Sequence, residues 1–315
     1  MEYNKAISDL AIGDAIEGFY LLRSAQSKIT STGKPFLILT LADRTGAVEG
    51  KVWDYAGPIG RADEGKVVKI RGNVGEYRGS VQITVDRIRL AAEGDPVDPA
   101  SLVPEAPIAQ DTAMAEVRRY LASIQDADYR AAAEELRRHG EDFPLIPAAK
   151  SVHHGFRMGL LMHTGNMLKI ADFLAGLYPE VIDRSLLLAG TFAHDLAKAR
   201  EFQLSELGLA TDYTVAGQLL GHLVMGAQEA AEVTKALGIP EEKGMLLQHL
   251  ILSHHGEPEF GAAVKPACAE AELLSYIDGI DSRMEICREA LAETETGRFS
   301  ERIFALDGRR MYRHE

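Results

Sequence analysis

Residues 185–202, SLLLAGTFAHDLAKAREF, decide how the C-terminal part of this 315-residue chain folds. The Leu- and Ala-rich run predicts a buried helix. His194 and Asp195 fall inside it. A bare buried carboxylate costs several kcal/mol, so Asp195 needs a cation or a strong hydrogen-bond partner. The segment therefore predicts a helical domain built around a polar centre.

More histidines and another aspartate interrupt apolar segments on both sides of this stretch. Their neighbours recur at helical spacing, which predicts that each lies on a helix facing the interior. Gly256, after the last histidine pair, is typical of the residue that follows a helix end. The residues are His163 (GLLMHTGNMLKIADFL, 159–174), His222 (GQLLGHLVMG, 217–226), His254 and His255 (MLLQHLILSHH, 245–255) and Asp278 (AELLSYIDGIDSRM, 271–284).

Imidazole and carboxylate ligands together favour Mn, Fe, Co, Ni or Zn over calcium. Because no cysteine is among them, a catalytic site is expected rather than a structural zinc site. Seven ligands exceed what one tetrahedral ion needs. We therefore expect two divalent ions, with Mn²⁺ favoured, roughly 3.5–4 Å apart and bridged by Asp195. A lone histidine such as His222 is more often a hydrogen-bonded core residue than a metal ligand. The assignment of His222 as a ligand therefore depends on the other candidate ligands.

The order of these residues resembles a known family. His163, the pair His194-Asp195 followed by Leu-Ala-Lys198, and Asp278 resemble the HD-domain phosphohydrolases, all-helical metal enzymes that hydrolyse phosphoric esters. The other three histidines resemble the binuclear branch, and over nearly the whole chain the resemblance is to the YhaM-type 3′-to-5′ exoribonucleases. The resemblance implies as metal ligands His163, His194, Asp195, His222, His254, His255 and Asp278.

Lys198 lies three residues after Asp195 and four after His194, on the same face of a continuous helix. Its ammonium could offset charge on a phosphate, so with Asp195 it is a candidate catalytic residue. The alternative is a surface lysine. Binuclear HD enzymes carry lysine at the matching position, which favours catalysis. Asp281 is either a ligand or, as we favour, an acceptor that orients an imidazole.

The pair His153 and His154 precedes the first expected ligand by about three helical turns. We expect it to contact the substrate phosphate or terminal sugar, since YhaM-type proteins carry a similar pair. The alternative is a solvent-exposed helix start. His249 is expected to be structural, and no partner is identified for His139 or His314.

Residues 1–92 alternate Val, Ile and Phe with polar residues between Gly- and Asp-rich turns, which predicts five strands and a small barrel. The stretch GKPFLILTLADRTGAVEGKVWD (33–54) resembles nucleic-acid-binding OB domains. Turns are expected at Gly33-Lys34-Pro35, Thr45-Gly46 and Gly79-Ser80. The fold class is thus an N-terminal all-β OB-fold barrel followed by an all-α HD-domain helical bundle.

OB-folds bind single strands by stacking bases on aromatic rings and by pairing the backbone with basic residues. Phe36 and Trp53 could instead be packing residues. The substrate-binding candidates are Phe36, Trp53, Tyr77, Lys34 and Arg78, with Arg23, Lys28, Lys51 and Arg71 as further basic residues.

Composition limits these expectations. The net charge of −13 and pI near 5.3 weigh against a protein coated with nucleic acid, although charges balance within the barrel. No apolar run is long enough to span a bilayer, so no membrane association is expected. Two separated cysteines, Cys268 and Cys287, fit a reducing, cytoplasmic location.

Four prolines between residues 93 and 109 predict an extended linker. We therefore expect an OB-fold domain at 1–92, the linker at 93–109 and the HD domain at 110–315. The basic, aromatic C-terminal tail packs either on the helical domain or on a neighbouring subunit of a homo-oligomer.

With these features, the resemblance to the YhaM-type enzymes implies a metal-dependent exoribonuclease that degrades single-stranded RNA, or also single-stranded DNA, from the 3′ end to nucleoside 5′-monophosphates. One alternative is an HD-type phosphodiesterase acting on a cyclic dinucleotide or free nucleotide. The cyclic-dinucleotide branch carries Gly-Tyr-Pro after its paired histidines, whereas Gly-Glu-Pro follows His255 here. The other alternative is a non-catalytic RNA- or nucleotide-binding protein.

Overall fold

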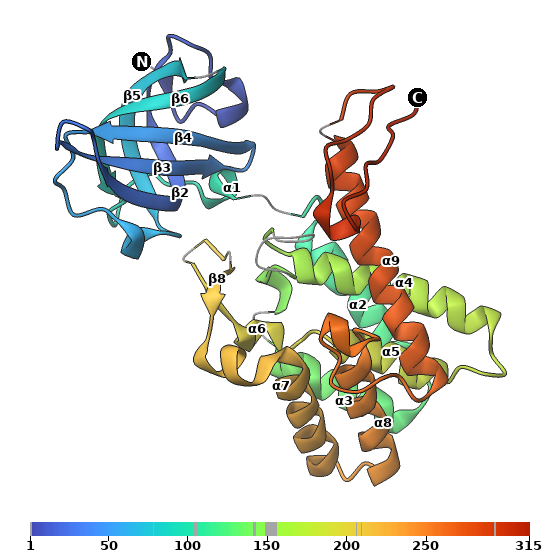
Figure 1. Cartoon of the computed structure of the whole chain (residues 1–315). Coiled ribbons are helices and arrows are strands. Elements are labelled where there is room, and N and C mark those ends of the chain that lie inside the picture. Colours follow the sequence, from blue (N-terminus) through green and yellow to red (C-terminus); the bar gives the residue numbers. More distant parts are fainter. Residues whose placement is uncertain are drawn as a thin grey trace. The chain divides into compact units, whose positions relative to one another are not determined.

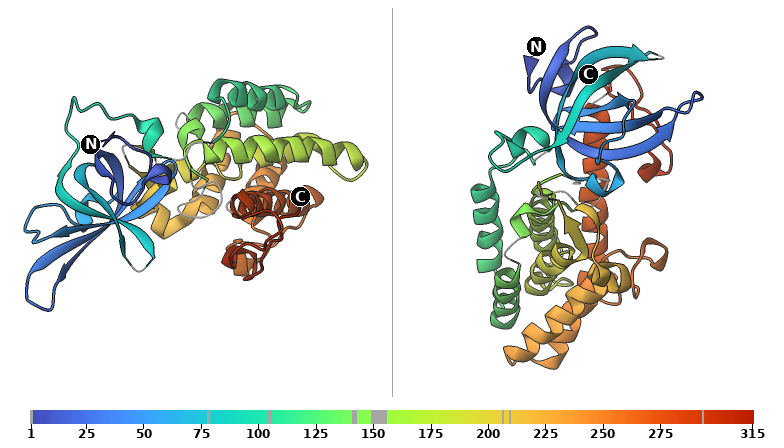
Figure 2. Two further views of the ribbon diagram at one scale, coloured as in Figure 1. Left: turned by 90° about the horizontal axis from the view of Figure 1, so that it is seen from above. Right: turned by 90° about the vertical axis from the view of Figure 1, so that its left-hand side faces the viewer.

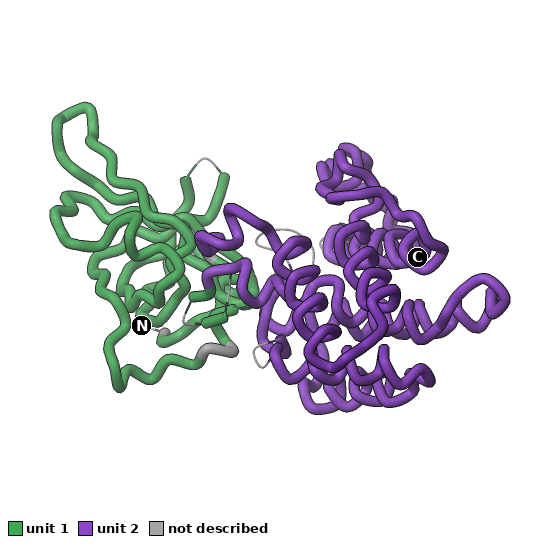
Figure 3. Tube along the Cα trace, turned by 90° about the horizontal axis from the view of Figure 1, so that it is seen from below, with its two compact units in different colours: residues 1–105, 204–211 green, residues 106–203, 212–315 purple. Residues whose placement is uncertain are grey.

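The chain forms two compact units in the computed structural model (Figure 3). Unit 1 comprises Met1–Glu105 with Leu204–Thr211, and unit 2 comprises Ala106–Gln203 with Asp212–Glu315. The candidate residues Arg78, His153 and His154 lie outside the described residues. The structure describes residues 2–77, 79–103, 106–140, 143–148, 156–205, 207–208, 210–292 and 294–315.

Unit 1 is a closed barrel of five strands, β2 to β6 (Figure 1). Strand β2 pairs antiparallel with both β3 and β5, while β4 pairs parallel with β6, and this closes the sheet. The short strand β1 (Glu2–Tyr3) runs parallel to β2. The strands are β2 (Ala15–Ile29), β3 (Pro35–Asp43), β4 (Gly46–Trp53), β5 (Val67–Tyr77) and β6 (Ser80–Leu90).

The predicted alternation fills the barrel with side chains from all five strands. Gly33 and Gly79 have φ of +82° and +83° at the turns between β2 and β3 and between β5 and β6, where a side chain would be strained. The five predicted strands and the OB-fold are thus confirmed. Fully buried core residues include Ile16, Leu22, Leu37, Leu39, Leu41, Val68 and Ile83.

The segment predicted to be an extended linker contains a short helix, α1 (Pro99–Leu102). Leu102 and Val103 are buried in a cluster with Phe19 and Leu21 of β2. This part of the segment is not extended, because two apolar side chains cover an apolar patch on the outside of the barrel.

Unit 2 is a bundle of helices (Figures 1 and 2). Helix α4 packs against α2, α5 and α9, and α7 packs against α8. In the described part of the chain, no helix is both long and apolar enough to cross a membrane. The longer helices are α2 (Gln110–Ala122), α3 (Ala127–His139), α4 (Gly159–Leu177), α5 (Arg184–Ala193), α7 (Val215–Ala236), α8 (Glu241–Ser253) and α9 (Ala269–Ala292).

Shorter elements connect these helices. The C-terminal tail folds back on itself through bridges between Phe299 and Tyr312 and between Ile303 and Arg309. It packs on unit 2, since Leu306 is buried and the Arg313 guanidinium donates to the carbonyl of Leu291 at the end of α9. The short elements are α6 (Lys198–Glu201), β7 (Phe202–Leu204), β8 (Ala210–Tyr213) and 3-10 turns at Ile7–Asp9, Arg61–Asp63, Phe143–Leu145, Pro258–Phe260 and Phe304–Leu306.

Candidate metal centre and nucleic-acid surface

The helix predicted through residues 185–202 breaks at the His194-Asp195 pair. Helix α5 ends at Ala193 with His194 as its C-cap, and α6 begins at Lys198. The expectation of one continuous helix is wrong here. Adjacent residues of a helix point about 100° apart, so a turn after α5 lets both His194 and Asp195 face one pocket.

Most of the other candidate side chains also lie at helix ends or kinks. His163 is in the first turns of α4, and His254 is the C-cap of α8. His222 follows Gly221, whose φ of +70° kinks α7. Asp278 lies within α9. Helix packing therefore directs side chains from five helical regions towards Asp195.

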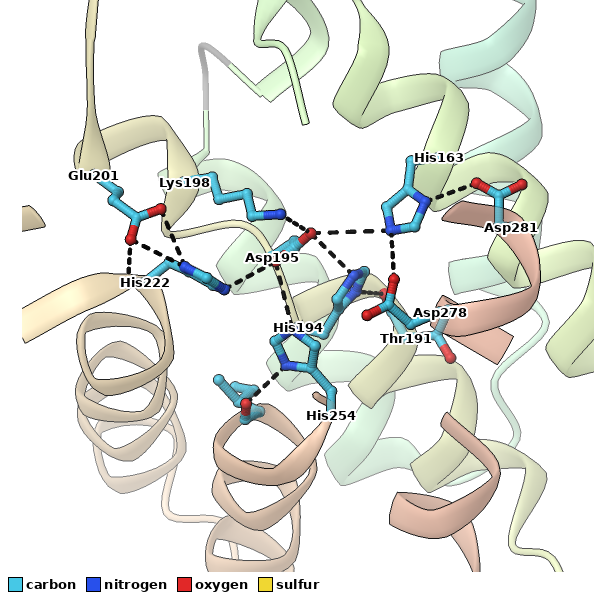
Figure 4. Close-up of polar contacts among 11 residues, drawn as sticks. His163, Thr191, His194, Asp195, Lys198, Glu201, His222, His254, Asp278 and Asp281 are labelled. Atoms are coloured by element: carbon cyan, nitrogen blue, oxygen red, sulfur yellow. Dashed lines mark hydrogen bonds and ion pairs between the residues drawn. The ribbon is translucent and has the colours of Figure 1, made fainter. Parts of the chain in front are cut away.

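The Asp195 carboxylate lies at the middle of the cluster (Figure 4). Its Oδ1 atom is 3.3 Å from Nε2 of His222 and 3.6 Å from Nε2 of His254. Its Oδ2 atom is 3.3 Å from Nε2 of His194, 3.9 Å from Nε2 of His163 and 2.7 Å from Nζ of Lys198. Each carboxylate oxygen thus faces its own pair of imidazoles.

The surrounding backbone and carboxylates fix the tautomer of these imidazoles. Nδ1 of His194 donates to the Thr191 carbonyl at 2.7 Å, and Nδ1 of His254 donates to the Ile251 carbonyl at 2.8 Å. Nδ1 of His222 lies 3.1 Å from the Glu201 carboxylate. Since each Nδ1 carries the proton, each Nε2 lone pair is directed at Asp195, as metal ligation requires.

His163 is bound by carboxylates on both ring nitrogens. Its Nδ1 donates to Oδ2 of Asp281 at 2.7 Å, and its Nε2 lies 3.3 Å from Oδ1 of Asp278. Asn166 donates to the other oxygen of Asp281 at 3.0 Å. Burial lowers the pKa of His163, but Asp278 and Asp281 outweigh burial and raise it to about 9. A metal ion must therefore displace a proton from His163 in order to bind it.

The remaining charges of the cluster also depend on their neighbours. Burial favours neutral Asp195, but the charge of Lys198 outweighs burial and holds the pKa of Asp195 well below its ordinary value. Burial lowers the pKa of His254 to about 3 and also lowers the pKa of His255. The centre therefore combines an ionised Asp195 with neutral imidazoles at His254 and His255, the protonation states of metal ligands.

Several buried polar atoms here have no hydrogen bond among the described residues. Such atoms cost free energy unless something else satisfies them. Those of the cluster are Nε2 of His194, His222 and His254, Oδ1 of Asp195 and Nδ1 of His255. Two ligand sets lie within metal-binding reach, His222 with His254 and His255, and His163 with His194 and Asp195. The residues present thus fit divalent metal ions.

Glu201 is a component that the sequence did not single out. It is buried at the end of α6, and its Oε1 atom also accepts from the His222 backbone N–H at 3.0 Å. Gly217 permits this arrangement, because a Cβ there would collide with the Glu201 carbonyl oxygen. Burial raises the pKa of Glu201, but hydrogen bonding to His222 outweighs it and lowers the pKa. The sequence did contain a signal for this role, because Glu201 lies in the same apolar stretch, residues 185–202, as Asp195.

The structure brings all seven predicted ligands together, with Lys198 beside them. Three other histidines of the described part of the chain, His139, His249 and His314, lie outside the cluster. His249 accepts from the Ala267 backbone N–H at 2.8 Å, consistent with a structural role. His139, for which no partner was expected, lies 3.1 Å from Glu229.

A cavity of about 970 Å³ opens onto the centre. Its wall includes His163, Lys198, His222 and Asp278. The aromatic side chains of Phe260 and Tyr276 also line it and are 74% and 62% exposed, so they can contact a ligand. The volume is large enough for a nucleotide-sized ligand.

On the barrel, Phe36, Trp53 and Tyr77 form an aromatic surface around Lys51 in which Phe36 is half-buried. Phe36 stacks on Trp53 with ring centroids 5.1 Å apart, and Trp53 and Tyr77 are each 50% exposed. The Lys51 ammonium lies 4.5 Å from the Tyr77 ring centroid. Lys34 forms a 3.0 Å ion pair with Asp54 and is exposed. Exposed rings with adjacent cations are what base stacking on an OB-fold requires.

Comparison with known families agrees with both halves of this description. Residues 22–91 match the family model of the OB-fold nucleic acid binding domain, and residues 160–283 match that of the HD domain. The chain therefore joins an OB-fold domain to an HD domain. The HD domain and the His/Asp cluster together indicate a metal-dependent phosphohydrolase that carries a nucleic-acid-binding domain.

Two solved structures are similar to part of this chain. One is a domain of replication protein A from Methanococcus maripaludis, at 24% identity over 28% of this chain and 94% of that chain, with a TM-score of 0.25. Another is the OB domain of Ta0387 from Thermoplasma acidophilum, at 16% identity over 31% of this chain and 92% of that chain, with a TM-score of 0.26.

Proposed function

We propose that the protein is a metal-dependent 3′-to-5′ exoribonuclease that hydrolyses single-stranded RNA to nucleoside 5′-monophosphates. The observation that carries this proposal is the position of Asp195, whose two oxygens face separate sets of imidazoles. A carboxylate so placed is suited to bridge two ions. Mn²⁺ is the ion that we favour.

The proposed ligands divide into two sets around Asp195. His222, His254 and His255 would hold one ion, and His163, His194 and Asp278 would hold the other. Bound ions would acidify water to supply a nucleophile at neutral pH and would withdraw charge from phosphoryl oxygens. Asp281 and Glu201 orient His163 and His222 through their Nδ1 atoms, as partners of ligating imidazoles do.

Lys198 offsets negative charge that develops on the phosphoryl group. Its ammonium is 2.7 Å from Asp195 and lines the cavity. Burial lowers the pKa of Lys198, but Asp195 outweighs burial and raises it, so the side chain stays cationic. A fixed cation in a partly buried site stabilises a developing charge more strongly than one in water.

Substrate binding is divided between the two units in this proposal. Phe260 and Tyr276 offer apolar faces for the base of the terminal nucleotide at the cavity. Phe36, Trp53 and Tyr77 stack bases further along the strand, helped by Lys34 and Lys51. A protein of net charge −13 then binds RNA by stacking more than by general electrostatic attraction.

RNA labelled at one end or the other tests the proposal. We expect 3′-labelled RNA with Mn²⁺ to release labelled mononucleotide at once, whereas 5′-labelled RNA shortens stepwise. EDTA should stop both. Internal fragments as first products would indicate an endonuclease. Hydrolysis of cyclic dinucleotides or free nucleotides with RNA left intact would indicate the alternative phosphodiesterase.

A further inference from the structure

We propose that a basic groove on the outside of the barrel binds the phosphate backbone of single-stranded RNA. The groove has a volume of about 520 Å³ and is lined by Lys69 and Arg71 of β5 and by Arg87 and Arg89 of β6. It is separate from the aromatic pair of Phe36 and Trp53. The inference rests on the proposed function, because it requires that the barrel binds RNA.

The basic residues of the groove oppose one another across the sheet. Lys69 pairs in register with Arg89, and Arg71 pairs with Arg87. Like charges directly opposite on adjacent strands destabilise a sheet. Two such pairs in succession therefore destabilise the barrel. Their presence requires a reason other than stability.

Among the described residues, acids form ion pairs with only one of these two pairs, although Glu17 lies opposite Arg71 across β2 and β5. Lys69 lies 2.8 Å from Glu17, and Arg89 is bound by both carboxylate oxygens of Asp95, at 2.6 and 2.9 Å. The remaining acid of the groove, Asp86, accepts from Asn73 at 3.2 Å.

Arg71 and Arg87 are both exposed and form no ion pair with any residue that the structure describes. The hydrogen bond from Lys69 is the main reason that the pKa of Glu17 is lowered, and the charges of Arg71 and Arg87 lower it further. Two adjacent guanidinium groups are well suited to phosphate oxygens, which they bind in a bidentate manner.

The position of the groove favours a nucleic-acid backbone as its ligand. Val52 and Tyr55 also line it, and they flank Trp53 and Asp54 in the chain. The groove is therefore lined in part by the chain neighbours of the segment that carries Trp53. A strand whose bases stack on Trp53 can continue with its phosphates against Arg71 and Arg87, as on OB-folds that combine stacking with a basic path.

Binding of full-length protein to a single-stranded RNA of about 20 nucleotides, longer than the site of one OB-fold, tests the inference. EDTA prevents cleavage, and fluorescence anisotropy at several salt concentrations gives the affinity and its salt dependence. The test variant is Arg71→Gln/Arg87→Gln. Its matched control is Arg44→Gln/Arg61→Gln, which changes two exposed arginines of unit 1 outside the groove.

We expect the test variant to bind about tenfold or more weakly at about 0.1 M salt, with the slope of log K against log salt reduced by about 1.4. Its melting temperature should equal or exceed that of the original protein, because a repulsive pair has been removed. If the test variant and the control have the same affinity and the same salt dependence, the groove does not bind RNA, although the protein still does. A lower melting temperature with an unchanged slope would show a structural role and also overturn it. No binding by the original protein would overturn both the groove and the proposed function.

Discussion

The Nδ1 atom of His163 lies 2.7 Å from the Oδ2 atom of Asp281, a carboxylate three residues beyond the candidate ligand Asp278. This contact fixes the ring so that Nε2 faces the metal centre. Replacing Asp281 with Asn should therefore raise the Mn²⁺ concentration needed for half-maximal activity by about 10–100-fold. Excess Mn²⁺ should restore most of the activity. Asp111→Asn, at an exposed position on α2, is the control, and an unchanged Mn²⁺ requirement in Asp281→Asn would contradict this role.

Asp195→Asn should abolish hydrolysis and remove the stabilisation that Mn²⁺ gives to the folded protein. Ligand binding raises the free energy of unfolding by about 2.7 kcal/mol at a concentration one hundred times Kd. Melting curves with and without Mn²⁺, together with measured metal content, check this. RNA binding in EDTA should persist, since the aromatic surface belongs to the other unit. Full metal content in the variant would show that Asp195 is not a necessary ligand.

Lys198→Met should lower kcat by about 10²–10³, the usual loss when a group that stabilises transition-state charge is removed. The metal content should be retained, because Lys198 is not among the proposed ligands. The control is Lys235→Met, which changes an exposed lysine in the last turn of α7. A variant that loses metal as well as activity would instead assign Lys198 to holding Asp195 in place.

Trp53→Ala should weaken RNA binding by about 1–3 kcal/mol, the usual value for one stacked base. Hydrolysis of a small activated phosphodiester should be unchanged, because it needs only the metal centre. Tyr178→Ala is a matched control, since Tyr178 and Trp53 are both 50% exposed and Tyr178 lies in unit 2. Equal loss on both substrates would assign Trp53 to folding.

Asp126 caps helix α3 and also binds α8. Its carboxylate accepts from the backbone N–H groups of Asp128 and Tyr129 at 2.9 and 3.1 Å, and from the Lys243 ammonium at 2.6 Å. Asp126→Ala should lower the free energy of unfolding by about 1 kcal/mol for the cap alone. Asp126→Asn keeps a capping oxygen, so its free energy of unfolding should fall by less. Urea unfolding of both variants measures these losses.

The same contact makes part of the stability depend on pH. The hydrogen bond from Lys243 is the main reason that the pKa of Asp126 is lowered. Asp126 therefore binds a proton more readily in the unfolded state than in the folded state. Its contribution to the free energy of unfolding is complete above about pH 4 and is lost as the pH falls further. The stability difference between the original protein and Asp126→Asn should shrink below about pH 4. A difference that grows there would contradict this assignment.

The amino-acid sequence predicted much of the fold because the relevant signals are local. Alternating apolar residues and the glycines at 33 and 79 specified the five strands and two of the hairpins. The helix end at His254-His255 and Gly256 was likewise visible, and Gly256 has φ of +76°. The end of helix α5 at Ala193 could not be predicted, because SLLLAGTFAHDLAKAREF has helical propensity throughout.

The candidate ligands could also be predicted from the sequence, since a histidine or aspartate on an apolar helix face requires a polar partner wherever the helix packs. The tertiary structure decided which partner each one has. Only the packing of five helical regions placed Asp195 between two sets of imidazoles and brought Glu201 to His222 and Asp281 to His163. Hydrophobic periodicity determines which side of a helix is buried, whereas the distances between side chains on different helices depend on crossing angles and helix ends that periodicity does not encode.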